Sequence, residues 1–204
     1  ISDYTLPCFT RATYLAELQW FIQWYINQYI GQALLPAEAA VLQEMFALIV
    51  EQALSQPQVL VHKDYHSRNL LVLPNNKVGV IDFQDALRGP ITYDLASLLY
   101  DHYIAWPYER LCEWARHYQQ QLLQAGLLLQ DNFSEFMRWH DWVALQRVLK
   151  NLGNFVRLNL QAHKPAYLQD IPRIYRYILD ITQRYPELHP LHDLLISYKP
   201  ESVK

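Results

Sequence analysis

Glycine and cysteine are both scarce in this chain of 204 residues. The five Gly residues are so widely spaced that no two of them could form a Gly-x-Gly-x-x-Gly phosphate-binding loop. The two cysteines, Cys8 and Cys112, form no Cys-x-x-Cys pair. This excludes a disulfide framework and a paired redox motif. It fits a reducing compartment, so we expect a cytoplasmic protein.

Long apolar runs and an excess of charge are missing as well. No stretch of 18 apolar residues predicts a membrane span, and the opening ISDYTLPCFTR lacks the basic and apolar parts of a signal peptide. The net charge of -3 gives no basic footprint for nucleic acid. We therefore expect neither a membrane nor a nucleic acid as partner, and the oligomeric state stays open. Because the chain begins with Ile, we expect it to be a trimmed piece of a longer protein.

The spacing of apolar residues predicts a mostly helical chain. Segments with helical spacing are 11–30, 37–54, 92–105, 108–126, 132–160, 167–185 and 188–197. Short β-rich runs are VLV (59–61), LLVL (70–73) and VGVID (78–82), and the turn-forming PNNK joins the last two. We therefore predict a mostly α protein with one small β island (α+β), forming one lobe over residues 1–204.

Side chains with oxygen atoms gather in the β island. Asp64 and Asn69 lie in the loop after the first β-rich run, and Asp82 ends the third. Such oxygens suit Mg²⁺, which proteins usually hold with one or two of them together with substrate phosphates. The Asp64 carboxylate could instead accept a proton from a hydroxyl. The island therefore offers a base and metal ligands.

Each of these positions also has a purely structural interpretation. A His that follows a buried strand, as His62 does, is more often a hydrogen-bonded structural residue than a catalyst. His62 and His66 are four positions apart, but zinc binding at that spacing needs a helix, and the β-rich flanks argue against one. Asp85 and Asp94 could simply cap turns or a helix. The pattern as a whole is more specific than its members.

Three motifs in order carry a resemblance to a known family. HKDYHSRN (62–69) matches His-x-Asp-x-x-x-x-Asn, VIDFQD (80–85) supplies an Asp-Phe pair after a β run, and GPITYDLASLL (89–99) follows. This series resembles the aminoglycoside phosphotransferase-like small-molecule kinases, which are relatives of the protein kinases. The resemblance implies the C-terminal lobe of a protein-kinase-like fold, with ATP as phosphate donor and Mg²⁺ as cofactor.

The resemblance also implies roles for single residues. Asp64 and His62 would form the catalytic loop, with Asp64 orienting or deprotonating the acceptor hydroxyl and His62 bracing the loop. Asn69 and Asp82 would hold Mg²⁺ on the ATP phosphates. Asp94 would be a structural support. Arg68 could reach a phosphate or a sugar, or could be a solvated loop cation.

A kinase of this family also needs a glycine-rich cover and a lysine that contacts the phosphates, on strands before the catalytic loop. Only two predicted helices precede the loop in this sequence. We therefore expect a C-terminal lobe without its nucleotide-binding lobe. We expect this chain by itself to bind MgATP weakly and to have little or no activity.

The acceptor is indicated by the segment LQRVLKNLGNFVRL (145–158), which has an apolar stripe opposite a cationic and amide stripe. The polar stripe contains Arg147 and Lys150, and it could be a solvated outer face or a wall of the acceptor site. Asp85 and Arg88 are further candidates for acceptor contacts. Together with ELQWFIQWYI, this segment resembles the bacterial anomeric kinases of cell-wall amino sugars.

Other functions stay open at this point. Within the wider family the acceptor could instead be an aminoglycoside, choline or homoserine. A kinase-like module that binds without chemistry is a further alternative, and so is a purely structural helical domain. The presence of all three of Asp64, Asn69 and Asp82 argues against loss of catalysis, because a binding module has no chemical need for them.

Overall fold

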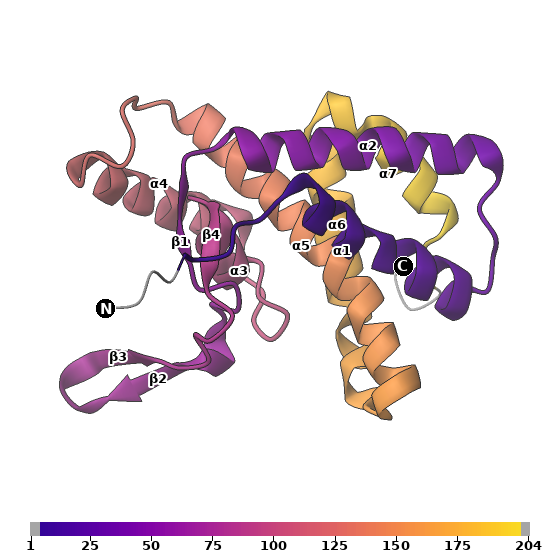
Figure 1. Ribbon diagram of the computed structural model, residues 1–204, viewed down its shortest axis with the longest axis horizontal. Helices are drawn as coiled ribbons and strands as arrows, with labels where there is room; N and C mark the ends of the chain where they lie inside the picture. Colours follow the sequence, from indigo (N-terminus) through magenta and orange to yellow (C-terminus); the bar gives the residue numbers. More distant parts are fainter. Residues whose placement is uncertain (1–4, 201–204) are drawn as a thin grey trace. The chain divides into compact units, whose positions relative to one another are not determined.

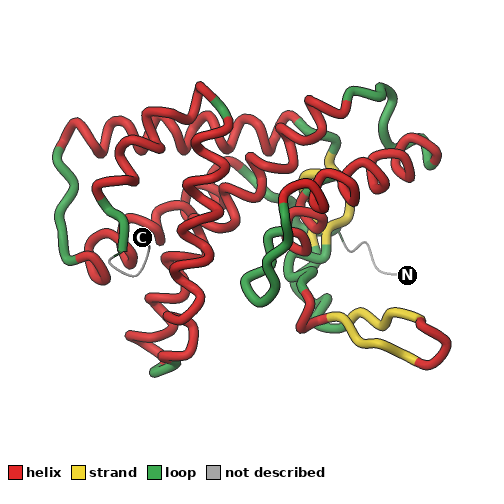
Figure 2. Tube along the Cα trace, turned by 180° about the vertical axis from the view of Figure 1, so that it is seen from behind, coloured by secondary structure: helices red, strands yellow, loops and turns green. Residues whose placement is uncertain are grey.

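A computed structural model of the chain describes residues 5–200, and it is mostly helical with four short strands among these residues (Figures 1 and 2). The elements in chain order are α1 (Arg11–Trp20), η1 (Phe21–Ile30), α2 (Pro36–Ser55), β1 (Gln58–Val61), η2 (Ser67–Asn69), β2 (Leu70–Leu73), η3 (Pro74–Asn76), β3 (Lys77–Val80), β4 (Leu87–Pro90), α3 (Tyr93–Leu99), α4 (Tyr108–Gln124), α5 (Phe133–Ala162), η4 (Pro165–Asp170), α6 (Ile171–Arg184), η5 (Pro186–Leu188) and α7 (His189–Ser197). The predicted fold class is confirmed. No helix within residues 5–200 is both long enough and apolar enough to cross a membrane.

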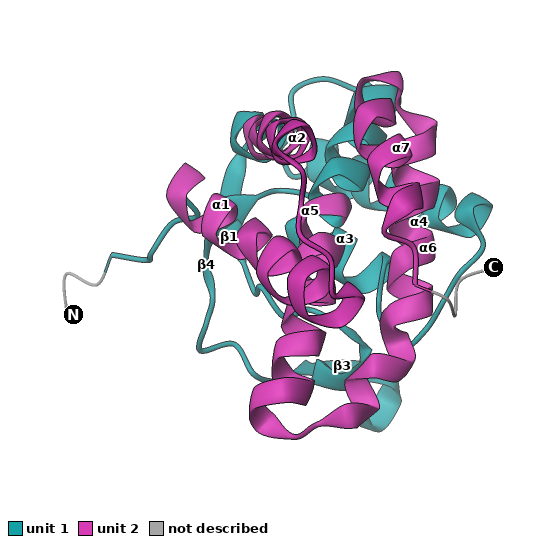
Figure 3. Ribbon diagram, turned by 90° about the vertical axis from the view of Figure 1, so that its right-hand side faces the viewer, with its two compact units in different colours: residues 1–10, 52–144 teal, residues 11–51, 145–204 magenta. Residues whose placement is uncertain are grey.

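The chain divides into two compact units, which Figure 3 colours separately. Unit 1 combines residues 1–10 with 52–144, and unit 2 combines residues 11–51 with 145–204. Unit 1 holds all four strands of the described chain, together with α3 and α4. The three sequence motifs therefore lie within unit 1.

Unit 1 contains two separate antiparallel strand pairs. β1 pairs with β4, with Val61 opposite Leu87, and β2 pairs with β3, with Leu70 opposite Val80. The sequence did not predict β4, because its residues LRGP include both Gly and Pro and show no β-rich run. The third predicted strand was too long at its end. It stops at Val80, before Asp82 adopts a left-handed backbone with φ of 69°.

The helix predicted over 92–105 is also too long, because α3 ends at Leu99. The Asp101 carboxylate accepts hydrogen bonds from the backbone N–H of Tyr103 (2.9 Å) and from that of Ser67 (2.9 Å). A side chain that binds the backbone N–H two residues ahead makes a turn and competes with helix continuation. Pro107 then precedes α4.

The β2–β3 hairpin exposes apolar side chains on both faces. Val72 (88% exposed) and Val78 (61% exposed) lie opposite one another on one face, and Leu71 (44% exposed) and Leu73 (41% exposed) lie on the other. At the tip, Asn75 and Asn76 have positive φ, as the turn-forming PNNK segment predicted. Two-stranded hairpins are marginally stable alone. An exposed apolar hairpin is therefore a candidate surface for a ligand or for further protein.

Unit 2 is helical and contains a close approach of α5 to the junction of α1 with the π-helix η1. A Cβ atom at Gly153 would overlap the carbonyl of Trp20 and lie 2.7 Å from the backbone nitrogen of Phe21. Only Gly fits here, because the neighbouring atoms are backbone and cannot rotate away. The sequence did not predict that residues 21–30 leave α-helical geometry.

Replacement of Gly153 by Ala is expected to lower the free energy of unfolding by about 2 kcal/mol. Overpacking against a backbone costs about 3 kcal/mol, and the helix propensity of Ala offsets about 1 kcal/mol of this. Urea denaturation checks the prediction, with Gln161→Ala as the control at an exposed position of the same helix. A Gly153→Ala variant as stable as the wild type would contradict the close packing.

Candidate active site

The segment between β1 and β2 forms a loop with hydrogen bonds of its own. The backbone N–H of His66 donates to the carbonyl of Asp64 (3.1 Å), and the N–H of Asn69 donates to the carbonyl of His66 (2.9 Å). The turn η2 closes the loop at Asn69, directly before β2. The loop therefore presents Asp64, which is partly exposed, between two strands of fixed position.

Asp94, in the first turn of α3, accepts two hydrogen bonds from the start of this loop. Its Oδ2 accepts from the backbone N–H of His62 (2.7 Å), and its Oδ1 accepts from that of Lys63 (3.1 Å). One carboxylate thus fixes the two residues directly before Asp64. Hydrogen bonds to a charged acceptor such as a carboxylate are stronger than hydrogen bonds between two neutral groups.

The backbone of Lys63 lies in the left-handed region, with φ of 77°. A residue with a Cβ pays for this conformation with about 1–2 kcal/mol, while Gly adopts it without strain. The two bonds to Asp94 hold Lys63 in this shape.

Replacement of Lys63 by Gly is therefore expected to leave the loop in place and to change the free energy of unfolding by less than about 1 kcal/mol in either direction. The relief of backbone strain stabilises the folded state, and the extra freedom of Gly in the unfolded chain opposes it. Replacement by Val is expected to destabilise by about 2 kcal/mol, because positive φ is strained most for β-branched residues. Thermal unfolding of both variants tests this order. Equal melting temperatures would contradict the left-handed backbone.

Asn69 joins the catalytic loop to the segment after β3. Its Nδ2 donates to the backbone carbonyl of Asp64 (2.9 Å) and to Oδ2 of Asp82 (3.3 Å). The structure therefore joins Asp64, Asn69 and Asp82, with Asn69 lying 5 positions from Asp64 and 13 from Asp82 in the sequence. Because both hydrogen bonds use Nδ2, the amide oxygen of Asn69 stays available as a metal ligand.

The donor set fits Mg²⁺. Asn69 and Asp82 supply one amide oxygen and one carboxylate, and Mg²⁺ is usually held by one or two protein oxygens plus substrate phosphates and water. Within residues 5–200 there is no cluster of three or more His, Cys, Asp or Glu that could form an all-protein cage. The geometry thus favours a shared site that a substrate phosphate completes.

His62 and Gln84 support the segment around Asp82. The His62 ring is hydrogen-bonded through Nε2 to the carbonyl of Ile81 (3.0 Å), and Gln84 donates through Nε2 to Oδ1 of Asp82 (2.8 Å). The Nδ1 of His62 is buried and has no hydrogen-bond partner among the described residues. The His62 ring thus links the catalytic loop to the backbone before Asp82. This contact suits the predicted bracing role better than proton transfer.

The role of Asp101 in positioning the loop was not predicted from the sequence. Its side chain is 2% exposed, and it holds the second half of the loop through Ser67, as Asp94 holds the first half. The sequence shows only an Asp after the apolar run of α3. Such an Asp is common at the end of a helix, so it gave no reason to single out Asp101. Nearby, the Arg68 guanidinium lies 3.6 Å from the centre of the Tyr103 ring, while the side chain stays exposed.

Tyr118, on α4, adds a phenol to the surroundings of the loop. Burial raises its pKa, and the Asp94 carboxylate and Tyr65 raise it further. The phenol therefore stays protonated near neutral pH, where it can donate a hydrogen bond but cannot act as a base.

The predicted acceptor residues fall into both units. Asp85 and Arg88, in unit 1, are exposed, and Arg88 donates weakly through Nη2 to the carbonyl of Gln58 (3.4 Å). Arg147 and Lys150 belong to unit 2 and are only 5% and 8% exposed. The interpretation of their stripe as a solvated outer face was therefore wrong.

The environment of Lys150 explains its burial. Its ammonium lies 3.7 Å from Oε1 of Glu17, whose other oxygen accepts a hydrogen bond from Gln146 (2.9 Å). Buried charges need such partners, because removal from water is costly. The α5 segment is thus covered on its polar side as well as on its apolar side. Acceptor contact by Arg147 and Lys150 stays a prediction.

Comparison with known proteins gives one family. The sequence profile described as the phosphotransferase enzyme family matches residues 3–136. An N-acetylmuramate/N-acetylglucosamine kinase of Pseudomonas putida is 39% identical over 193 residues, which cover 95% of this chain and 57% of the relative. A kinase of the same name from Neisseria meningitidis is 39% identical, with 94% of this chain and 57% of the relative covered. The one from Pseudomonas aeruginosa is 40% identical, with 94% and 56% covered. The chain therefore spans a little over half the length of these relatives.

Proposed function

Since this chain belongs to the phosphotransferase enzyme family, we propose that it is the catalytic and acceptor-binding lobe of an ATP-dependent kinase. The acceptor is the anomeric hydroxyl of a cell-wall amino sugar, N-acetylmuramate or N-acetylglucosamine. The observation that carries the proposal is the hydrogen-bonded group of Asp64, Asn69 and Asp82. A kinase that uses cellular ATP to recycle such sugars belongs in the cytoplasm.

In this proposal one residue acts on the proton of the acceptor, and two others hold the metal ion on the phosphates of ATP. Asp64 accepts the proton of the acceptor hydroxyl or orients that hydroxyl. Asn69 and Asp82 hold Mg²⁺, which neutralises charge on the ATP phosphates. Asp94, Asp101 and His62 touch none of the reacting groups and position the loop. Phosphoryl transfer asks mainly for alignment and charge neutralisation, so a few well-held residues suffice.

The choice of an amino sugar rests on the relatives, whose names state that acceptor. The matches to two of them cover 95% and 94% of this chain, which is more than the region 3–136 that the family profile matches. We propose Arg68 and Asp85, which are exposed, as acceptor contacts, while acceptor contact by the buried Arg147 and Lys150 stays a prediction. Cationic groups among them would suit the carboxylate of N-acetylmuramate.

The β2–β3 hairpin supports a further part of the proposal. Its exposed residues Val72, Val78 and Val80 form an apolar surface. Val80 lies two positions before Asp82 in the sequence. In the whole protein we propose that the adenine base and a nucleotide-binding lobe cover this surface. Apolar patches of this kind usually mark a binding surface.

The test is a panel of acceptors offered to the whole protein with MgATP, with ADP release as the readout. The panel contains N-acetylmuramate, N-acetylglucosamine, kanamycin, choline and homoserine. Turnover with the two sugars at least tenfold above the others is the expected result. Preference for kanamycin, choline or homoserine would contradict the acceptor assignment, and no turnover with any of them would contradict the kinase itself.

A further inference from the structure

The guanidinium of Arg68, in the catalytic loop, lies over an aromatic ring and has no ionic partner. Its central carbon is 3.6 Å from the centre of the Tyr103 ring. The side chain is exposed, and within residues 5–200 its guanidinium makes neither an ion pair nor a hydrogen bond. A guanidinium that rests on a ring keeps its N–H groups, which point outward in its plane, for another partner. These groups match a carboxylate in a two-point contact.

One buried carboxylate fixes both parts of this pair. Asp101, which is 2% exposed, accepts hydrogen bonds from the backbone N–H of Tyr103 (2.9 Å) and from that of Ser67 (2.9 Å). Ser67 directly precedes Arg68, so the backbones that carry the ring and the guanidinium bind the same side chain. The Tyr103 ring also packs edge to face with His66 of the loop, at 5.8 Å between ring centres. The ring therefore has a fixed place beside the catalytic loop.

Arg68 lies close to the proposed catalytic carboxylate. The residue after it, Asn69, donates through Nδ2 to the backbone carbonyl of Asp64 (2.9 Å). Four residues span at most about 14 Å when extended, and this bond closes the loop, so the distance between the two backbones is shorter. An acceptor whose hydroxyl meets Asp64 can therefore reach Arg68 with another of its groups.

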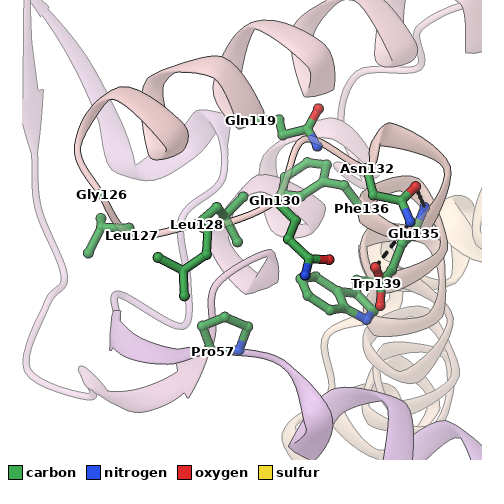
Figure 4. Close-up of a pocket in the computed structure, with 11 residues that line it drawn as sticks. Pro57, Gln119, Gly126, Leu127, Leu128, Gln130, Asn132, Glu135, Phe136 and Trp139 are labelled. Atoms are coloured by element: carbon green, nitrogen blue, oxygen red, sulfur yellow. Dashed lines mark hydrogen bonds between the residues drawn. The ribbon is translucent and has the colours of Figure 1, made fainter.

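A cavity of about 490 Å³ elsewhere in unit 1 does not suit an anionic group (Figure 4). Its lining comes from the end of α4, the loop that follows, the start of α5 and Pro57 before β1, whereas the catalytic loop begins at the other end of β1. Leucine side chains and Phe136 give it apolar walls, and Glu135 is the one ionisable side chain among the residues that line it. A carboxylate would meet no cation there and would be repelled by Glu135. The Arg68 guanidinium is the better place for a negative charge.

We propose that Arg68 binds the carboxylate that N-acetylmuramate carries and N-acetylglucosamine lacks, and that Tyr103 is the positioning residue that holds the guanidinium for this contact. The inference rests on the proposed function, and it names the residues that set the balance between the two sugars. An Arg side chain loses rotamer freedom when it binds an anion. The contact with the ring removes part of this cost in advance. The pair therefore favours the anionic sugar over the neutral one.

The test measures kcat/KM of the whole protein for each sugar at saturating MgATP, and its readout is the value for N-acetylmuramate divided by that for N-acetylglucosamine. Arg68→Gln is expected to lower this ratio about 30-fold, within the range for a hydrogen bond between charged groups. Tyr103→Leu should lower it about fourfold, the value of a cation–π contact at an exposed site. Tyr103→Phe keeps the ring and should keep the wild-type ratio. In the Arg68→Gln background, Tyr103→Leu should lower the ratio no further, because Tyr103 acts only through Arg68.

Arg116→Gln is the matched control. Arg116 is an exposed residue of α4 in the same unit, and its guanidinium lies 3.8 Å from the centre of the Phe133 ring. Loss of this second pair should leave the ratio at its wild-type value. Circular dichroism shows whether each variant is folded, and Arg68→Gln decides by itself if Tyr103→Leu does not fold.

The outcomes separate this inference from the proposed function. A wild-type ratio in Arg68→Gln, or a ratio that Tyr103→Leu lowers further in the double variant, would overturn the inference, while turnover of both sugars would uphold the proposed function. An equal loss for both sugars with a raised KM for ATP in Arg68→Gln would overturn it as well, because the guanidinium would then contact the phosphates. No turnover of either sugar by the wild type would overturn the proposed function, and the inference with it.

Discussion

Replacement of Asp64 by Asn is expected to lower kcat for sugar phosphorylation by about 10³-fold, within the range for loss of a general base. The KM for ATP should change little, because the phosphate ligands Asn69 and Asp82 are unaltered. Asn has the shape of Asp but cannot accept a proton at neutral pH. The loop itself should stay in place, because Asn69 binds the backbone carbonyl of residue 64 and not its side chain.

Steady-state kinetics with the whole protein checks this prediction. Asp131→Asn is the matched control, since Asp131 is an exposed loop carboxylate of the same unit. The control should keep wild-type kcat, and both variants should melt within a few degrees of the wild type. If Asp64→Asn kept more than a tenth of the wild-type kcat, the assignment of Asp64 would be wrong.

Replacement of Asp94 by Ala is expected to reduce both stability and activity. The N–H groups of His62 and Lys63 would lose their charged acceptor, which costs about 3 kcal/mol in the free energy of unfolding. The loop before Asp64 would then be free to shift, and a misplacement of about 1 Å can lower kcat by about 10²-fold. Lys63 should hold its left-handed conformation less firmly, because the hydrogen bond from its backbone N–H to Asp94 would be lost.

Asp94→Asn separates the positioning role from simple charge loss. Asn keeps one acceptor oxygen but turns an N–H₂ group toward the second backbone N–H, so we expect about half of the loss in stability. Urea denaturation and kcat measured together test this order. The pH profile of kcat should keep the shape of the wild type in both variants, unlike in Asp64→Asn. Wild-type stability in Asp94→Ala would contradict the bracing contact.

The elements that the sequence predicted well are those with a long and regular pattern. The apolar stripe Leu145, Val148, Leu149, Leu152, Phe155 and Val156 is buried throughout, as the spacing of 145–158 required. The turn between β2 and β3 could be predicted from the sequence because Asn tolerates positive φ. The order of the three motifs predicted that Asp64, Asn69 and Asp82 belong to one site. The structure adds the hydrogen bonds that join them.

The features that the sequence did not predict depend on contacts between distant segments. The strand β4 is defined by its pairing with β1, and its own residues carry no signal. The burial of Lys150 depends on Glu17, which is remote in the sequence. Asp101 acquires its role only because Ser67 lies beside it in space. A single sequence records none of these neighbours, so periodicity alone left open whether the polar side of 145–158 faces solvent or the acceptor.

The most direct test of the account is to identify the atom that receives the phosphate. The whole protein is incubated with MgATP and N-acetylmuramate, and the product is examined by ³¹P and ¹H NMR. The account predicts a phosphate coupled to the anomeric proton, formed by the wild type and Asp131→Asn and absent with Asp64→Asn. A phosphate coupled to a proton at any other ring position, or the same product from Asp64→Asn, would contradict it.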